Sequence, residues 1–361
     1  MSDQEKWVKD TEPFIKHFGS LETKPEEMGS YITPNSQFFV VNAGNTPRLK
    51  LYDYRLTITG NGVEREVELS YGDLLGLPSH TVFCYLECAG NMRHLFEEIN
   101  GDQLQLESNW TRWRLGGVGM AVWTGVSLKT VLELAGLRDN AFDVNLKGLD
   151  QDTREEGINR PIPIKKALDE DTLLATLMNG EPLPADHGFP LRVIVPGWVG
   201  TNSVKWLGTI TVSTSKTWVH RNRSMYVFKG NSWPPEKYAP AEGGEITLQN
   251  IKSSLILPWN GAIQAGRQLI RGVARSPEIP IKAVDWSDDD GGTWQAARLI
   301  PPFLPYGWVR FEFEWKARPG KQRLMTRATD EEGNVQPMKI PFNEEGYLFN
   351  QVYGHPIEVK A

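Results

Sequence analysis

Short runs in which apolar and polar residues alternate predict β-strands along much of the chain. Residues 54–70 contain two such runs joined by Gly60-Asn61-Gly62, which predicts a hairpin. Other segments have the spacing of amphipathic helices, so strands and helices are expected to be mixed. The further strands are predicted at residues 38–44, 192–197 and 206–214, and the helices at residues 71–78, 127–137 and 164–180.

The pattern changes after residues 231–248, a stretch rich in proline and glycine that is typical of a linker. Short alternating runs then follow one another with turn residues between them, which predicts a β-sandwich of immunoglobulin type. The acidic segment 287–292 is expected to be a hairpin turn because it lacks the ligand spacing of a calcium loop. The predicted fold class is α+β, with an N-terminal arm (residues 1–30), a mixed α/β domain (31–240) and the sandwich (247–361).

The length and the net charge of the chain limit the classes of protein to which it can belong. A chain of 361 residues exceeds the usual size of one hydrophobic core. The net charge of −6 argues against broad nucleic-acid binding, and no apolar run is long enough to suggest a membrane span. The charged N-terminus lacks the order of a secretory signal, so we expect a cytoplasmic protein, or a periplasmic one if an export signal was trimmed.

The chain has only two cysteines, Cys84 and Cys88. Both are expected to be free thiols, and Cys84 is interpreted as a core residue because free cysteine is usually buried. Cys88 is followed by Ala-Gly-Asn, which lets the backbone approach a large ligand, and then by Arg93 and His94, whose charge would favour a thiolate. A metal bound there must take its other ligands from histidine, carboxylate or a cofactor.

Three long motifs resemble the sulfite oxidase family of molybdenum enzymes, in the same order and at similar spacing. They are ECAGNMRHLF, RWRLGGVGMAVWTGVSLKTVLELAGL and LMNGEPLPADHGFPLRVIVPGWVGTNSVKWLGTITV. The later stretches DWSDDDGGTWQAARL and RATDEEGNVQP resemble the immunoglobulin-like dimerisation domain of that family. The resemblance implies a molybdenum held by one pyranopterin dithiolene and one protein cysteine, here Cys88, in a homodimer.

Cofactor contacts are also implied by the resemblance. A pyranopterin carries a phosphate and many ring donors and acceptors, which suit guanidinium, imidazole and backbone groups. The positions that match are Asn91, Arg93, His187, Arg192, Ser203 and Lys205. Trp113 matches a tryptophan that lines the approach of the substrate.

The substrate pocket departs from the family pattern. Val41 and Ala43 stand where the family has arginine and histidine, and Phe228 replaces the tyrosine beside the metal oxo group. Tyr226 lies two residues earlier, but it is expected to point to the other face of the strand. A glycine-rich loop ending in arginine is replaced by residues 274–280. The predicted anion contacts that remain are Arg93, Arg221 and Arg223.

The resemblance implies oxygen-atom transfer to or from a small sulfur oxyanion or a related oxo substrate, with sulfite oxidation as the first expectation. Electrons would pass to a separate carrier protein such as a cytochrome, because the sequence contains no haem-attachment motif and no haem is expected. Two alternatives stay open. The same centre could reduce a sulfoxide or another oxo group, or the chain could be a non-catalytic binding module in which Cys88 is only a core residue.

Overall fold

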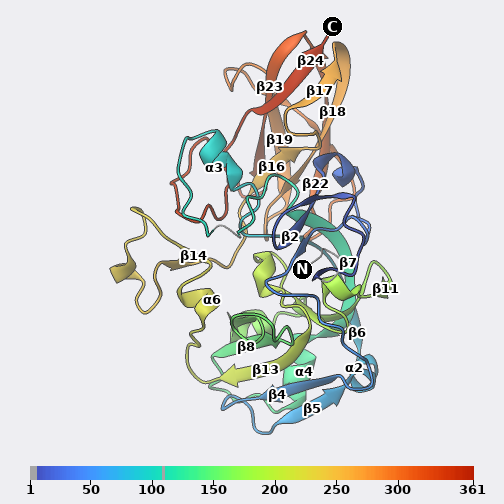
Figure 1. Cartoon of the computed structure of the whole chain (residues 1–361), viewed down its shortest axis with the longest axis vertical. Helices are drawn as coiled ribbons and strands as arrows, with labels where there is room; N and C mark the ends of the chain where they lie inside the picture. The colour runs from blue at the N-terminus through green and yellow to red at the C-terminus, as the bar shows by residue number, and fades with distance from the viewer. Residues whose placement is uncertain (1–5, 108–109) are drawn as a thin grey trace.

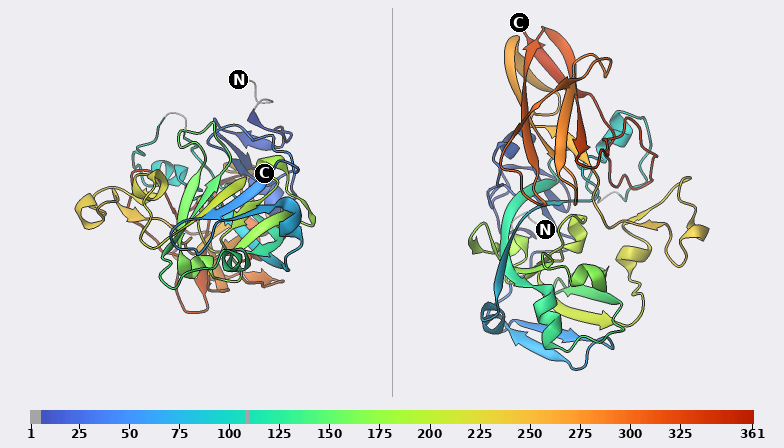
Figure 2. Two further views of the ribbon diagram at one scale, coloured as in Figure 1. Left: turned by 90° about the horizontal axis from the view of Figure 1, so that it is seen from below. Right: turned by 180° about the vertical axis from the view of Figure 1, so that it is seen from behind.

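The computed structural model describes residues 6–107 and 110–361. A β-sandwich built from the last third of the chain lies at one end of the long axis, and a mixed sheet with short helices lies at the other (Figures 1 and 2). Between them runs a second sheet, whose strand β7 extends from the sandwich toward the opposite end. This arrangement is the predicted α+β class followed by a sandwich.

The central sheet contains the cysteine segment. Its order is β11-β10-β7-β6, and β12 also pairs with β10. Its members are β6 (Ser79–Glu87), β7 (Val118–Ser127), β10 (Leu173–Met178), β11 (Glu181–Pro182) and β12 (Arg192–Ile194). Because Glu87 is the last residue of β6, Cys88 begins the turn at the end of this strand.

The helix predicted at residues 164–180 is wrong over most of its length. Only α5 (Ile164–Ala167) is helical, and Leu173–Met178 form the strand β10. Leu173, Leu174 and Ala175 are fully buried between β7 and β12. A strand that is covered on both faces carries a continuous apolar run, which periodicity cannot distinguish from a buried helix.

The sheet at the far end confirms the predicted hairpin, since β4 and β5 pair antiparallel. Its order is β5-β4-β13-β8-β9, and β13 runs parallel to β4. The strands are β4 (Arg55–Thr59), β5 (Val67–Ser70), β8 (Asp143–Gly148), β9 (Asn159–Pro163) and β13 (Leu207–Ser213). Helices α2 (Tyr71–Leu75) and α4 (Leu128–Leu134) pack against its apolar core, as predicted from their spacing.

The described part of the N-terminal arm contains two strands that were not predicted, and they form a sheet with the strand predicted at residues 38–44. β1 (Phe14–Lys16), β2 (Ser20–Thr23) and β3 (Val40–Val41) form a small sheet, and a short 3-10 helix, η1, spans Pro25–Gly29. The arm is anchored on the domain that follows it, because the backbone N–H groups of Val8 and Lys9 donate to the Asp186 carboxylate. Residues of the arm thereby line a cavity in that domain.

The sandwich consists of the sheets β16-β18-β22-β21 and β17-β24-β23-β19-β20. The first contains β16 (Lys252–Leu255), β18 (Gly266–Arg275), β21 (Arg298–Ile300) and β22 (Val309–Ala317). The second contains β17 (Gly261–Gln264), β19 (Ile281–Ser287), β20 (Gln295–Ala296), β23 (Gly320–Asp330) and β24 (His355–Lys360). Their inner faces share one apolar core, in which Trp286 stacks on Phe313. Residues 288–294 turn between β19 and β20, as predicted for the acidic segment.

The predicted linker is more ordered than its composition suggested. Strands β14 (Val227–Phe228) and β15 (Gly244–Glu245) pair, and the chain between them, which contains η4 (Pro235–Lys237), projects from the side of the molecule (Figure 1). Among the described residues, no helix combines the length and apolar character needed to cross a bilayer.

Candidate active site

Cys88 lies in a tight turn between β6 and the short helix α3 (His94–Glu98). Its backbone N–H donates to the Gly117 carbonyl at 2.9 Å, and the Asn91 N–H donates to the Cys88 carbonyl at 2.9 Å. Gly90 leaves room for the Arg93 guanidinium, because a Cβ at that position would come within 2.1 Å of it and would displace it. The turn therefore holds Cys88 and Arg93 close together at the wall of a cavity of about 620 Å³.

The structure brings most of the predicted site residues to this one cavity. They come from separate elements, including the 3-10 helices η2 (Ala185–His187) and η3 (Gly200–Asn202) and the helix α6 (His220–Arg223). The predicted residues that line it are Cys88, Arg93, Trp113, His187, Arg192, Ser203, Lys205 and Arg221.

Two predicted residues do not line the cavity. Asn91 is buried beneath the turn, where its side chain accepts from the Gly117 N–H and donates to Glu87. Arg223 is exposed, and its Nε donates to the Pro240 carbonyl at 3.1 Å. Arg221 and Arg223 are two positions apart on α6, so their side chains leave the helix on nearly opposite sides and only Arg221 reaches the cavity.

Buried positive charge dominates one wall. The Arg192 guanidinium donates to the carbonyls of His187 and Ser203 at 2.9 and 3.0 Å, while its Nε has no hydrogen-bond partner. Burial lowers the pKa of Arg192 to about 9. Burial, together with repulsion from Arg192, also lowers the pKa of Lys205 to about 7, although the Asp186 carboxylate opposes this shift.

His187 is neutral in this setting, because burial and three neighbouring cations hold its pKa well below the usual value. One of these cations is Lys9 of the N-terminal arm, whose Nζ lies 2.9 Å from His187 Nε2. Burial lowers the pKa of Lys9 to about 7. The arm therefore contributes to the same basic wall, which could not be foreseen from the polar composition of residues 1–30.

This wall fits a large anionic ligand. Lysines whose charged forms are disfavoured by burial would regain charge beside a phosphate, and the free Nε of Arg192 is a donor without a protein acceptor. Asn42, which the sequence analysis missed, lines the cavity and accepts from Lys205 Nζ. The residues present therefore fit the phosphate and polar rings of a pyranopterin.

The charge around Cys88 differs from the sequence-based interpretation. Burial raises the pKa of the Cys88 thiol, while Arg93 and a hydrogen bond from the Trp113 side chain act in the opposite direction. His94 does not stabilise a Cys88 thiolate, because its side chain points away from the cavity and its Nδ1 bonds to the Trp113 carbonyl. Burial lowers the pKa of His94 to about 4, so it adds no positive charge. Cys84 is fully buried in an apolar cluster against which Cys88 packs, which confirms its interpretation as a core residue.

Tyr226 lines the cavity, whereas Phe228 stacks on Trp233 outside it. The prediction that Tyr226 faces away is therefore wrong. Residues two apart share one face of a regular strand, but Tyr226 precedes β14 and has a left-handed φ angle of +50°, so its side chain and that of Phe228 point in different directions. The Tyr226 ring stacks on Tyr347 at 5.3 Å between centroids and also faces Arg221.

The outer part of the cavity has cations that are already paired. Arg221 Nε donates to Glu155 at 2.7 Å, and Lys229 lies within 3.1 Å of both Glu242 and Glu345. Val41 and Ala43 line the same cavity without charge. Arg93 differs from these cations, because the described residues place no carboxylate within ion-pair distance of it; it faces the rings of Trp110 and Tyr347.

Comparison with known proteins identifies the class that this fold and site define. The family described as an oxidoreductase molybdopterin-binding domain matches residues 43–220. Sulfite oxidase of Gallus gallus is 34% identical over 327 residues, which cover 86% of this chain and 69% of that protein. Mitochondrial sulfite oxidase of Mus musculus is 36% identical over 339 residues, covering 89% of this chain and 60% of that protein.

The crystal structure of the sulfane dehydrogenase SoxCD from Paracoccus pantotrophus has a similar fold over nearly the whole chain. The TM-score is 0.81 at 26% sequence identity, with 98% of this chain and 87% of that chain covered. This chain belongs to the sulfite oxidase family of molybdopterin oxidoreductases. It spans about three fifths of the length of the mouse relative. Membership in a family of oxidoreductases argues against the binding-module alternative.

The depressed pKa values of Lys205 and Lys9 predict a pH-dependent stability for protein prepared without molybdenum. Between pH 7 and the ordinary lysine range, the unfolded chain binds protons that the folded chain does not. The free energy of unfolding should therefore rise with pH above 7, by at most about 1.4 kcal/mol per pH unit for each group.

Lys205→Met should remove the part of this slope that Lys205 contributes, which chemical denaturation at pH 7 and pH 9 would measure. The exposed Lys321→Met is the matched control and should keep the wild-type slope. An unchanged slope in Lys205→Met would contradict the assignment of Lys205 as a buried, largely neutral amine.

Proposed function

We propose that this protein is a molybdenum-dependent oxidoreductase that transfers an oxygen atom to or from a small sulfur compound. The observation that carries the proposal is the position of Cys88 on the wall of a cavity whose other wall is buried, cationic and poor in counter-charge. When bound, a molybdenum pyranopterin supplies a metal that exchanges an oxygen atom with the substrate and changes by two electrons.

The residues have separate tasks in this proposal. Cys88 provides the protein sulfur ligand, and its turn sets the direction of the thiol. Arg192, Lys205 and the neutral imidazole of His187 hold the anionic and polar parts of the cofactor, with Ser203 beside them. Trp113 closes the wall against water, because it is only 1% exposed and packs edge-on against Phe39. Asn91 lies beneath the turn and holds it in place through hydrogen bonds to Gly117 and Glu87.

Sulfite is the first substrate to test. The curated relatives named above are sulfite oxidases, and the structural relative is a sulfane dehydrogenase, so all of them act on sulfur centres. Arg93 supports an anionic substrate, since its guanidinium lines the cavity without a carboxylate partner among the described residues. We propose that it receives the oxyanion, with Arg221 as a second contact once its pairing with Glu155 is loosened.

A second candidate is reduction of a sulfoxide or another oxo group by the same centre. The observation that favours it is the pairing of Arg221 with Glu155 and of Lys229 with Glu242 and Glu345. A small dianion must exchange a strong hydration shell for fixed positive charge, and paired cations supply little of it. An uncharged oxo compound does not have this requirement.

The rest of the assembly follows from the same proposal. Residues 31–240 would form the cofactor-binding domain and residues 247–361 an immunoglobulin-like domain through which two copies form a homodimer. A separate electron-carrier protein would accept or supply electrons singly. These assignments are supported by the resemblance to the family and by the position of the sandwich at one end of the molecule (Figure 2).

Metal content tests the proposal directly. Protein purified from a host that makes the cofactor should contain near-stoichiometric molybdenum and pterin by elemental analysis and cofactor fluorescence. Cys88→Ser should lose most of the metal or alter its absorption spectrum, because a thiolate ligand is removed. Cys84→Ser is the matched control and should retain the wild-type metal content. Equal metal content in both variants, with the wild-type absorption spectrum, would exclude Cys88 as a ligand.

Steady-state kinetics with sulfite and with a sulfoxide distinguish the two candidates. If sulfite is the substrate, Glu155→Gln should raise kcat/KM for sulfite by about tenfold, because it frees the Arg221 guanidinium for a charge-assisted hydrogen bond. The gain should appear mainly in KM. Activity with the sulfoxide alone, unaffected by Glu155→Gln, would support the reductase and reject sulfite.

A further inference from the structure

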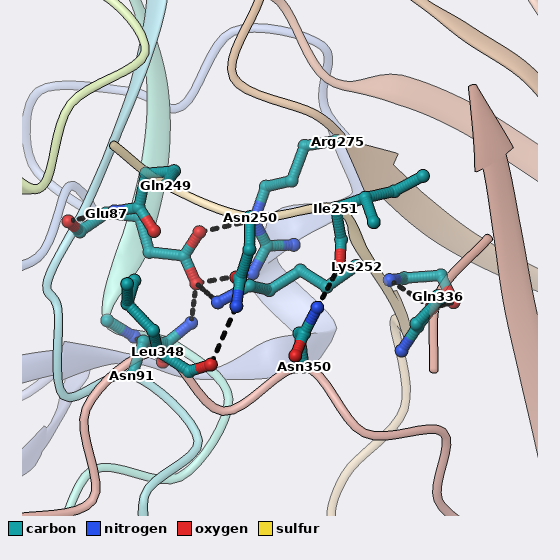
Figure 3. A network of polar contacts seen from close by, with 12 residues as sticks. Glu87, Asn91, Gln249, Asn250, Ile251, Lys252, Arg275, Gln336, Leu348 and Asn350 are labelled. Atoms are coloured by element: carbon teal, nitrogen blue, oxygen red, sulfur yellow. Dashed lines mark hydrogen bonds and ion pairs between the residues drawn. The ribbon is translucent and has the colours of Figure 1, made fainter. Parts of the chain in front are cut away.

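A buried cluster of charges is centred on Glu87, the residue before Cys88 (Figure 3), and its members Glu87, Lys252 and Arg275 do not line the cavity. Glu87, the residue before Cys88, is fully buried and receives two hydrogen bonds from Arg275, from Nε and Nη2, both at 2.7 Å. Lys252 Nζ lies 3.1 Å from the same carboxylate. Asn91 donates to it at 2.9 Å from within the cysteine turn.

The two cations come from the sandwich. Lys252 on β16 and Arg275 on β18 are register partners across two paired strands, so both reach Glu87 from one place. The Glu87 main chain is tied to the same side of the molecule, because its carbonyl accepts from Gln249 Nε2 at 2.8 Å. The end of β6 is thus fixed to the sandwich through both its side chain and its backbone.

The charges in the cluster do not balance. One carboxylate faces two cations, all of them at most 1% exposed. The described residues supply no second carboxylate to the cluster, and Arg275 Nη1 has no hydrogen-bond partner. Burying a charge without a counter-charge costs free energy, so the excess positive charge in this cluster needs a physical explanation. The residue that follows Glu87 in the chain is Cys88, so the excess charge lies beside the proposed metal ligand.

We propose that Glu87, Lys252 and Arg275 form a positioning cluster that holds the Cys88 turn from the sandwich side and places one net positive charge behind the metal ligand. The proposal rests on the proposed function, since it assumes a metal on Cys88. The Glu87 carboxylate fixes the position of the turn. Because two cations face this one carboxylate, the net charge of the cluster is positive. The reduction potential of the metal then depends on residues of the sandwich.

The test uses holoenzyme of three variants, Lys252→Met, Glu87→Gln and the double variant, and measures the midpoint potential of the metal by redox titration followed by EPR. Positive charge favours the more reduced metal. Lys252→Met should therefore shift the potential downward, and Glu87→Gln should shift it upward. The double variant keeps Arg275 alone, restores one net positive charge, and should return close to the wild-type potential.

Metal content and thermal unfolding are recorded for each variant, with Lys282→Met on the exposed side of β19 as the matched control. All three cluster variants should unfold at lower temperature, whereas the potential should move in opposite directions in the two single variants. Potentials that stay at the wild-type value, or that move in one direction with loss of stability, would overturn the proposal. Wild-type protein without metal would instead overturn the proposed function on which it rests.

Discussion

The cavity beside Cys88 is surrounded by more positive charge than the protein neutralises, and the rest of the site depends on this constraint. Arg192 is buried and Lys205 is half-buried on one side, and the buried Lys252 and Arg275 pair with Glu87 beside the cysteine turn. Burial disfavours their charged forms, as the lowered pKa values of Arg192 and Lys205 indicate. A site of this kind is incomplete until an anion enters it, which is why it suits a phosphate-bearing cofactor and a thiolate ligand.

The cavity changes character away from this basic wall. There the cations form ion pairs, as in Arg221 with Glu155, and aromatic rings such as Tyr226 and Tyr347 cover the surface. The inner wall is therefore suited to holding a fixed anionic group, whereas the outer part is suited to selecting among smaller molecules. Arg93 lies between the two regions, because its backbone belongs to the cysteine turn and its guanidinium faces the aromatic wall.

Local motifs predicted the site well where the chemistry is encoded over a few consecutive residues. The turn from Cys88 to Arg93 is such a case, since glycine and asparagine at fixed positions determine its shape. The residues that were predicted incorrectly are those whose side-chain directions or partners are set by tertiary structure. The left-handed backbone of Tyr226 separates the direction of its side chain from that of Phe228, and His94 is turned toward the Trp113 carbonyl. Glu87 and Lys252 are 165 positions apart, a pairing that no local pattern reveals.

The central claim is that Cys88 supplies a sulfur ligand to a molybdenum bound in this cavity. X-ray absorption at the molybdenum edge tests it most directly, because it counts the sulfur atoms around the metal. The account predicts one more sulfur ligand in the wild type than the two of the cofactor, and the loss of that ligand in whatever metal Cys88→Ser retains. The same number of sulfur ligands in both proteins would contradict it.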